Sequence, residues 1–315
     1  MDYFLVLVGV LLLLFGGDWL VKASVDIALR AKISLLVVGM TVVSFATSAP
    51  ELLVSLKAAL EGHVDISFGN VIGSNIANIS LILGLTAMVF PMQVSKRTMR
   101  VDWGIMFLIT LLLYLFLWND LLSFWEALIL FVLLVLYNLF QIRGSRKQEK
   151  ENTEISNAKL LKLWQMVFFL AAGIAGLRFG SEFLVKGAVN IATDWGISER
   201  VVGLTVVSIG TSLPELAASL IASFKGEQDL SLGNLIGSNI FNILAVLGIT
   251  GLITDLPVQS AALMTFDFPW LIGISLILLP FMLWMKRGVI SRWQGFIMFA
   301  LYTVYLLGVL GVILV

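Results

Sequence analysis

The sequence contains VVGMTVVSFATSAPELLVSLKAALEGHVDISFGNVIGSNIANI at residues 37–79 and repeats it at residues 201–243 as VVGLTVVSIGTSLPELAASLIASFKGEQDLSLGNLIGSNIFNI. At a constant offset of 164 positions, the two stretches share 27 of 43 residues. The same offset aligns FGGDWLVKASVDIA (15–28) with FGSEFLVKGAVNIA (179–192). The chain therefore has two related halves, and this duplication decides the architecture that we predict.

The composition indicates a protein that folds in lipid. Of 315 residues, 59% are hydrophobic and 13% charged, and the mean hydropathy is +1.01. Globular proteins are about half apolar and about a quarter charged. The net charge of zero favours no nucleic-acid partner. The absence of cysteine excludes disulfides and thiolate metal sites, and the single histidine, His63, lies in a short loop where we assign it no role.

Apolar segments long enough to cross a bilayer, roughly 20 residues each, occur ten times. They lie near residues 3–21, 36–60, 66–89, 101–118, 122–141, 164–187, 201–224, 230–253, 266–285 and 293–314. The offset of 164 residues aligns the first three apolar segments with the sixth to eighth, so each half contains five helices. Because five is odd, the halves must cross the membrane in opposite directions. We predict an all-α integral membrane protein with ten transmembrane helices in two inverted-topology five-helix repeats, the plan of many secondary transporters.

A polar segment separates the two halves. Residues 142–162 have mixed charge and no apolar periodicity, which is typical of a linker between a first repeat, 1–141, and a second, 163–315. Sixteen of the 20 lysines and arginines lie in this segment and in the connections after the first, third, seventh and ninth spans. Since cytoplasmic loops are enriched in basic residues, we expect a cytoplasmic linker and both termini outside.

The segment SFATSAPELLVS, residues 44–55, places a proline and a glutamate inside an apolar span. Pro50 cannot donate to the carbonyl of Ala46, so we expect the helix to kink there and free carbonyl oxygens. In lipid, a freed carbonyl is tolerated only where it lines a cavity. A proline alone more often serves packing, but an acidic residue at this depth indicates a functional site. The recurrence of Glu51 as Glu215 in the second repeat strengthens that interpretation.

The oxygen-bearing side chains on these helix faces form a matched set. The first repeat contributes Ser44, Thr47, Ser48, Glu51, Ser74 and Asn78, and the second contributes Ser208, Thr211, Ser212, Glu215, Ser238 and Asn242. Carboxylate, hydroxyl and amide oxygens suit hard cations such as calcium and sodium. Two carboxylates can be neutralised by one divalent cation or by two or three monovalent cations. A site of this kind can therefore exchange the two classes.

Neighbouring residues suggest supporting roles. Gly69, Gly73, Gly233 and Gly237 have the small-xxx-small spacing of helix packing, which would let the third and eighth spans press close to the second and seventh. We interpret Asn70 and Asn234 as supporting donors or helix caps rather than ligands. Asp18–Lys22 and Glu182–Lys186 have the spacing of i,i+4 ion pairs near span ends.

At these motifs the chain resembles the sodium/calcium exchanger family of the calcium:cation antiporter superfamily, of prokaryotic type. GTSLPE (210–215), GNVIGSNIAN (69–78) and GNLIGSNIFN (233–242) are similar to the family's two α-repeats. The resemblance implies alternating access, with the first and sixth helices sliding against the other eight. It also implies exchange of three sodium ions for one calcium, and the twelve residues above as ligands. At Ser44 and Ser208 it leaves side chain or backbone carbonyl open.

The chain departs from the family pattern at a few positions. ATSAPE (46–51) has alanine at two positions of the first motif, where the small side chain should preserve the geometry. Positions 78 and 242 are both asparagine. Potassium-dependent relatives resemble this pattern but have an aspartate in the second motif set, so we expect no potassium requirement. Residues 71–73 and 235–237 lack the motif of proton/calcium relatives. The protonation of a carboxylate should nevertheless let protons compete with the cations.

The resulting hypothesis is an antiporter that exchanges Na⁺ for Ca²⁺, not an enzyme, and it requires no cofactor. Another calcium/cation exchanger, coupled to protons or potassium, is the alternative within the class. A passive cation channel is an alternative from a different class, because ten helices in fused repeats could line a pore. A membrane scaffold would not explain the paired glutamates.

Overall fold

A computed structural model describes residues 1–151, 160–195, 208–283 and 288–311, with the backbone alone for residues 147–151 and Ser208. Nearly all described residues are helical, as the sequence predicts. In the first half the elements are α1 (Asp2–Ala31), α2 (Leu35–Val38), η1 (Gly39–Val43), α3 (Ser44–Thr47), α4 (Ala49–Leu60), α5 (Val64–Ile76), η2 (Ala77–Ile82), α6 (Leu83–Val89), β1 (Met92–Gln93), η3 (Thr98–Asp102), α7 (Trp103–Phe116), η4 (Leu117–Asn119), β2 (Leu121–Leu122) and α8 (Phe124–Glu151).

The second half has a similar order over its described residues. Its elements are α9 (Leu163–Asp194), α11 (Ser208–Gly210), α12 (Leu213–Phe224), α13 (Gln228–Phe241), η6 (Asn242–Leu247), α14 (Gly248–Ile253), β3 (Leu256–Pro257), η7 (Leu263–Asp267), α15 (Phe268–Leu283), β4 (Val289–Ile290) and α16 (Arg292–Val309). The segments η1, η2, η3, η6 and η7 are π-helical, and η4 is a 3₁₀ turn. Of the predicted linker, the part up to Glu151 continues α8 as helix.

Seven helical segments among the described residues are long and apolar enough to cross a membrane, and the bent pair Leu35–Thr47 and Ala49–Leu60 makes an eighth. These eight correspond to the predicted first to sixth, eighth and ninth spans. The seventh begins at residues 201–207, outside the described residues, and continues as the shorter apolar helix α12. The tenth corresponds to α16. The chain is therefore a multi-pass membrane protein.

Two of these segments form the centre of the molecule. Val64–Val89 and Gln228–Ile253 are each 83% buried, whereas the other single-helix spans are between 22% and 33% buried. Both belong to the motifs that are repeated in sequence. Apolar surface that stays exposed in the isolated chain of a membrane protein faces lipid, so these two segments lie inside the bundle and the less buried helices face lipid.

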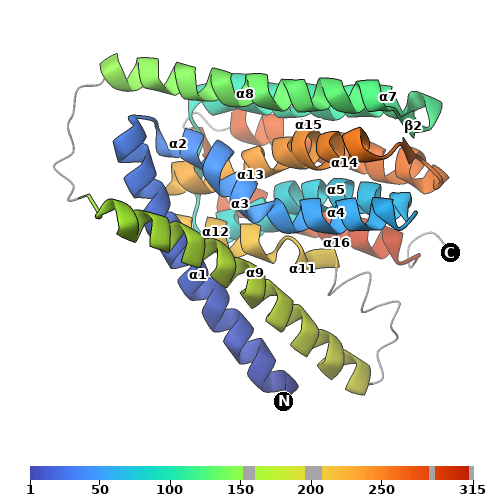
Figure 1. Cartoon of the computed structure of the whole chain (residues 1–315), viewed down its shortest axis with the longest axis horizontal. Coiled ribbons are helices and arrows are strands. Elements are labelled where there is room, and N and C mark those ends of the chain that lie inside the picture. The colour runs from blue at the N-terminus through green and yellow to red at the C-terminus, as the bar shows by residue number, and fades with distance from the viewer. Residues whose placement is uncertain (152–159, 196–207, 284–287, 312–315) are drawn as a thin grey trace.

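Helices α1 and α9 pack against each other and lie obliquely across the rest of the bundle (Figure 1). Their contact is made by glycines: a Cβ on Gly16 would lie 2.7 Å from the backbone nitrogen of Leu177, and one on Gly180 would lie 2.8 Å from that of Leu13. Small residues allow helix backbones to approach closely in membranes. The two helices therefore form a closely packed pair, distinct from the remaining bundle.

Two short strand pairs join the halves. Strand β1 pairs antiparallel with β4, with Met92 opposite Ile290, and β2 pairs with β3, with Leu121 opposite Pro257. Each pair takes one strand from each half of the chain. The connection after the third span therefore lies beside that between the ninth and tenth, and the connection after the fourth lies beside that after the eighth.

Candidate functional site

Both repeated motifs interrupt their helix at the residue before the Ala-Pro or Leu-Pro pair. Ser48 has φ −84° and ψ 3°, and the helix axis bends by 44° between residues 35–47 and 49–60. Ser212 has φ −90° and ψ 4° between α11 and α12. Pro50 and Pro214 then occupy the first turn of the new helix, where the missing N–H is tolerated. The predicted kink is confirmed in the first repeat, and the same backbone geometry recurs in the second.

Glu51 and Glu215 follow these breaks in the first turns of α4 and α12, and both are 0% exposed. The Ser48 hydroxyl donates to Oε1 of Glu215 over 3.3 Å, so a residue of the first repeat reaches the acid of the second. Among the described residues, both oxygens of Glu51 and Oε2 of Glu215 have no hydrogen-bond partner. Both acids thus lie buried at one site with most of their oxygens unused.

The hydroxyl residues also meet across the two repeats. The Thr47 hydroxyl lies 3.4 Å from that of Ser238 and 3.2 Å from Oδ1 of Asn234. Thr211 Oγ1 lies 3.5 Å from Oδ1 of Asn70. Ser74 and Ser212 are buried, and the Ser212 hydroxyl has no partner in the described part of the chain.

Asn70 and Asn234 support the backbone at the two breaks, as the sequence suggested. Asn70 Nδ2 donates to the carbonyl of Glu51 (3.1 Å) and to the Ser55 hydroxyl (2.9 Å). Asn234 Nδ2 lies 3.5 Å from the carbonyl of Glu215 and donates to the Ser219 hydroxyl over 3.0 Å. Each amide therefore links the carbonyl of an acidic residue to the next helix of the same repeat.

Asn78 and Asn242 lie in the π-helical segments η2 and η6, at the centre of the molecule. Both are 0% exposed. Over the described residues, neither side-chain atom of Asn78 has a partner, and Oδ1 of Asn242 has none. π-Helical turns occur often at functional sites. Sequence reasoning missed these turns, and it also missed the buried residues Asn75 and Asn239, although both recur at the offset of 164.

Ser44 and Ser208, the two remaining predicted ligands, begin the helical segments α3 and α11. The buried Ser44 hydroxyl lies within hydrogen-bond distance of the carbonyls of Gly39 (2.7 Å) and Asn234 (3.0 Å), so it links the second span to α13. Ser208 begins α11, but its side chain lies outside the description.

Glycines allow α13 to approach the second span. A Cβ on Gly233 would lie 2.3 Å from the carbonyl oxygen of Leu36, and one on Gly237 would lie 2.6 Å from the Cα of Met40. The predicted packing role is confirmed for this pair, and the contact is between repeats. For Gly69 and Gly73, no described atom lies within 4 Å of the Cβ position.

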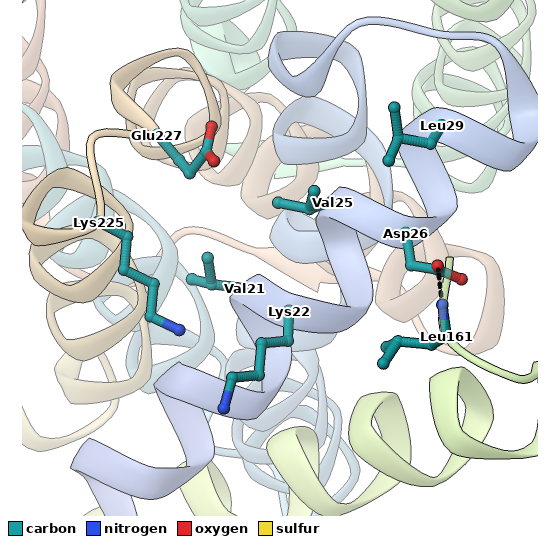
Figure 2. Close-up of a pocket in the computed structure, with 8 residues that line it drawn as sticks. All are labelled: Val21, Lys22, Val25, Asp26, Leu29, Leu161, Lys225 and Glu227. Carbon is teal, nitrogen blue, oxygen red and sulfur yellow. Dashed lines mark hydrogen bonds between the residues drawn. The ribbon is translucent and has the colours of Figure 1, made fainter. Parts of the chain in front are cut away.

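A separate cavity of about 550 Å³ lies between α1, the turn from α12 to α13, and Leu161 (Figure 2). Its lining combines apolar residues of α1 with charged residues, including Lys22, Lys225 and Glu227. None of the predicted ligands lines it. Burial raises the pKa of Glu227, as does the neighbouring Asp229. The cavity separates part of α1 from the bundle and is distinct from the candidate cation site.

Comparisons with known proteins agree on one family. The family model described as sodium/calcium exchanger protein matches residues 1–143 and 165–311. The chain is 42% identical to CaxA of Alkalimonas amylolytica over 262 residues, 82% of each protein. It is 32% identical to the sodium/calcium exchanger MaX1 of Methanosarcina acetivorans over 97% of each. A solved structure of the sodium-calcium exchanger NCX_Mj superposes with a TM-score of 0.83 at 33% identity, covering 98% of both chains.

Proposed function

Since the chain belongs to the sodium/calcium exchanger family, we propose that it is a secondary antiporter that exchanges Na⁺ for Ca²⁺ by alternating access. The ions bind in turn at the cage around Glu51 and Glu215. The observation that carries the proposal is the burial of both acids at one site with three of their four oxygens unpartnered among the described residues.

Electrostatics explains why such a site requires cations. A buried carboxylate without a partner is costly, and removing a charge from water costs several kcal/mol even after relaxation. Two carboxylates that repel each other are costlier still. A bound Ca²⁺ neutralises both, and sodium ions do the same. In the described ranges, no three acidic, histidine or cysteine side chains are placed so that they could hold one metal ion together, so neutral oxygens complete the coordination.

The neutral oxygens come from the residues that surround the acids. We assign this role to Ser44, Thr47, Ser48, Ser74, Asn78, Ser208, Thr211, Ser212, Ser238 and Asn242. Calcium takes about six to eight oxygen ligands, so different subsets serve calcium and sodium. The donors that meet across the repeats, Thr47 with Ser238 and Ser48 with Glu215, support one shared cage.

We assign ten membrane crossings in two inverted repeats, 1–141 and 163–315, joined by the segment 142–162. The strand pairs support this topology, in which the connections after odd-numbered spans lie on one side of the membrane and those after even-numbered spans lie on the other. Strand β1 pairs with β4, and they follow the third and ninth spans, whereas β2 and β3 follow the fourth and eighth. Each strand pair thus joins two connections that this topology places on the same side of the membrane. The basic residues in the connections after the odd-numbered spans support a cytoplasmic linker with both termini outside. We assign the protein to a prokaryotic plasma (inner) membrane, which the family resemblance implies.

The test is calcium uptake into vesicles containing the purified protein. Vesicles loaded with Na⁺ and diluted into Na⁺-free medium with Ca²⁺ should accumulate calcium, and equal Na⁺ on both sides should abolish the accumulation. Uptake should be the same with and without K⁺. A requirement for K⁺ would show that Asn78 and Asn242 serve a potassium-coupled exchanger. Uptake driven by a pH gradient without Na⁺ would identify proton coupling, and equally fast entry with Na⁺ on both sides would identify a channel.

A further inference from the structure

The central asparagines form two pairs that are equivalent in sequence. Asn75 and Asn78 lie on the third span, and Asn239 and Asn242 occupy the same positions on the eighth, 164 residues later. All four are between 0% and 1% exposed. Segment η6 contacts α4, which carries Glu51, and η2 contacts α12, which carries Glu215. The segments that carry Asn242 and Asn78 therefore pack against the helices that carry the two acids.

Asn75 holds Asn242 in one orientation. The Nδ2 group of Asn75 donates to the main-chain carbonyl of Asn239 over 3.1 Å, and its Oδ1 accepts from Nδ2 of Asn242 over 3.0 Å. A carbonyl can only accept, so Asn75 must present nitrogen to Asn239 and oxygen to Asn242. Asn242 must then present its nitrogen to Asn75. Its own Oδ1 remains buried and unpartnered among the described residues, and is free to bind a cation.

The equivalent pair in the other repeat is arranged differently. Asn239 Nδ2 donates to the carbonyl of Leu235 on its own helix over 2.7 Å, and its Oδ1 has no partner within the described part of the chain. Neither the side-chain nitrogen nor the side-chain oxygen of Asn78 has a hydrogen-bond partner among the described residues. Identical residues at equivalent positions therefore have different hydrogen bonding, with the amide of Asn242 held and that of Asn78 free.

We propose that Asn75 is a positioning residue that holds the Asn242 amide with its oxygen towards the bound cation. The cage then has one amide ligand oriented in advance and one, Asn78, that orients when the ion arrives. An amide turned the other way would present its N–H group to the cation, which is repulsive. This inference rests on the proposed function, because it requires a cation at the cage.

The first experiment compares Asn75→Ala with Asn239→Ala. Both remove a buried amide at the same position of a repeat. Among the described residues, however, the Asn239 side chain bonds only its own helix, and its substitution leaves the main-chain carbonyl in place. Calcium binding to the purified proteins is measured by calorimetry, together with sodium-driven uptake. Asn75→Ala should weaken calcium binding about three- to ten-fold, the value of one hydrogen bond, and Asn239→Ala less than two-fold. Equal losses would overturn the proposal.

A double-mutant cycle separates orientation from structural support. In Asn242→Asp both side-chain atoms are oxygens, so their orientation no longer matters. Asn75→Ala should then cause no further loss of calcium affinity, whereas additive losses would overturn the proposal. The binding measurement requires folded protein but not transport, so it decides even if Asn242→Asp transports nothing. Calcium binding and sodium-driven uptake by the unaltered protein test the proposed function separately, and their absence would overturn both.

Discussion

At the scale of single residues, the two buried acids carry the proposed exchange. Glu51→Gln and Glu215→Gln should each lower calcium uptake at least about a hundred-fold, because the cage loses half of the charge that balances Ca²⁺. At about 4 Å and an effective dielectric constant of about 20, each pair of unit charges contributes about 4 kcal/mol. Membrane insertion should not suffer, since an acidic residue at mid-membrane costs about 2.5–3.5 kcal/mol. Uptake and the amount of inserted protein are both measured.

Glu61→Gln is the matched control for these substitutions. Glu61 lies at the end of α4 with its side chain 56% exposed, 3.9 Å from Lys57 Nζ. Exposed ion pairs contribute little, so its loss should leave uptake within about two-fold of normal. Near-normal uptake by either buried-acid variant would refute the assignment of the cage.

Gly237 provides a second test at this scale. The Cβ of Gly237→Ala would lie 2.3 Å from the Ser44 hydroxyl and 2.6 Å from the Cα of Met40. Backbone cannot yield as a flexible side chain does, so α13 must move away from the second span and separate Thr47 from Ser238. We expect a loss of uptake and a lower melting temperature, because overpacking of this kind lowers the free energy of unfolding by about 1–3 kcal/mol.

Gly104→Ala is the control for that substitution, because no described atom lies within 4 Å of its Cβ position. It should leave melting temperature and uptake nearly unchanged. If Gly237→Ala behaved like Gly104→Ala, the close contact between α13 and the second span would not be needed to assemble the site.

At the scale of elements, a salt bridge connects the pair of helices α1 and α9 to the rest of the bundle. Asp18 on α1 pairs with Lys22 of the same helix (2.7 Å) and with Lys225, which follows α12. Figure 2 shows both lysine side chains at the rim of the cavity between α1 and α12. Because α12 carries Glu215, this ion pair connects the α1–α9 pair to the helix that holds one of the acids.

Asp18→Asn should raise the maximal rate of exchange and leave the apparent calcium affinity within about two-fold. The resemblance to the family implies that α1 and α9 slide against the other helices, and removing the ion pair makes the present arrangement easier to leave. Partly exposed pairs contribute about 0.2–1 kcal/mol, so the rate should rise by up to about five-fold. Rates measured over a range of calcium concentrations separate the two effects. A weaker affinity with an unchanged rate would contradict this role.

At the scale of the whole molecule, the charge of the cage predicts that exchange moves charge across the membrane. The two glutamates carry two negative charges, which one Ca²⁺ balances, whereas three sodium ions, as the family resemblance implies, leave one positive charge. Each elementary charge that crosses contributes about 2.3 kcal/mol per 100 mV. A negative interior should therefore favour sodium entry and calcium extrusion. Current is measured in vesicles during sodium-driven exchange, and the membrane potential is varied.

Exchange at full rate with no current and no response to voltage would contradict this prediction. It would indicate two sodium ions per calcium, or a proton on one glutamate during the sodium step. Uptake at acidic pH distinguishes these cases, because proton competition lowers calcium uptake when a carboxylate is neutralised.

The sequence alone determined the membrane class, the duplication and the residues of the candidate cage. These depend on local properties: the transfer of apolar segments into lipid, the missing N–H of Pro50 and the cost of a buried glutamate. The tertiary structure decided which oxygens meet. Ser48 contacts Glu215 and Thr47 contacts Ser238 across 167 and 191 residues of chain, through packing between helices that no local pattern reveals. The π-helical turns and the different hydrogen bonding of the identical Asn75–Asn78 and Asn239–Asn242 pairs were likewise visible only in the structure, since Asn75 bonds residues of the other repeat whereas Asn239 bonds its own helix.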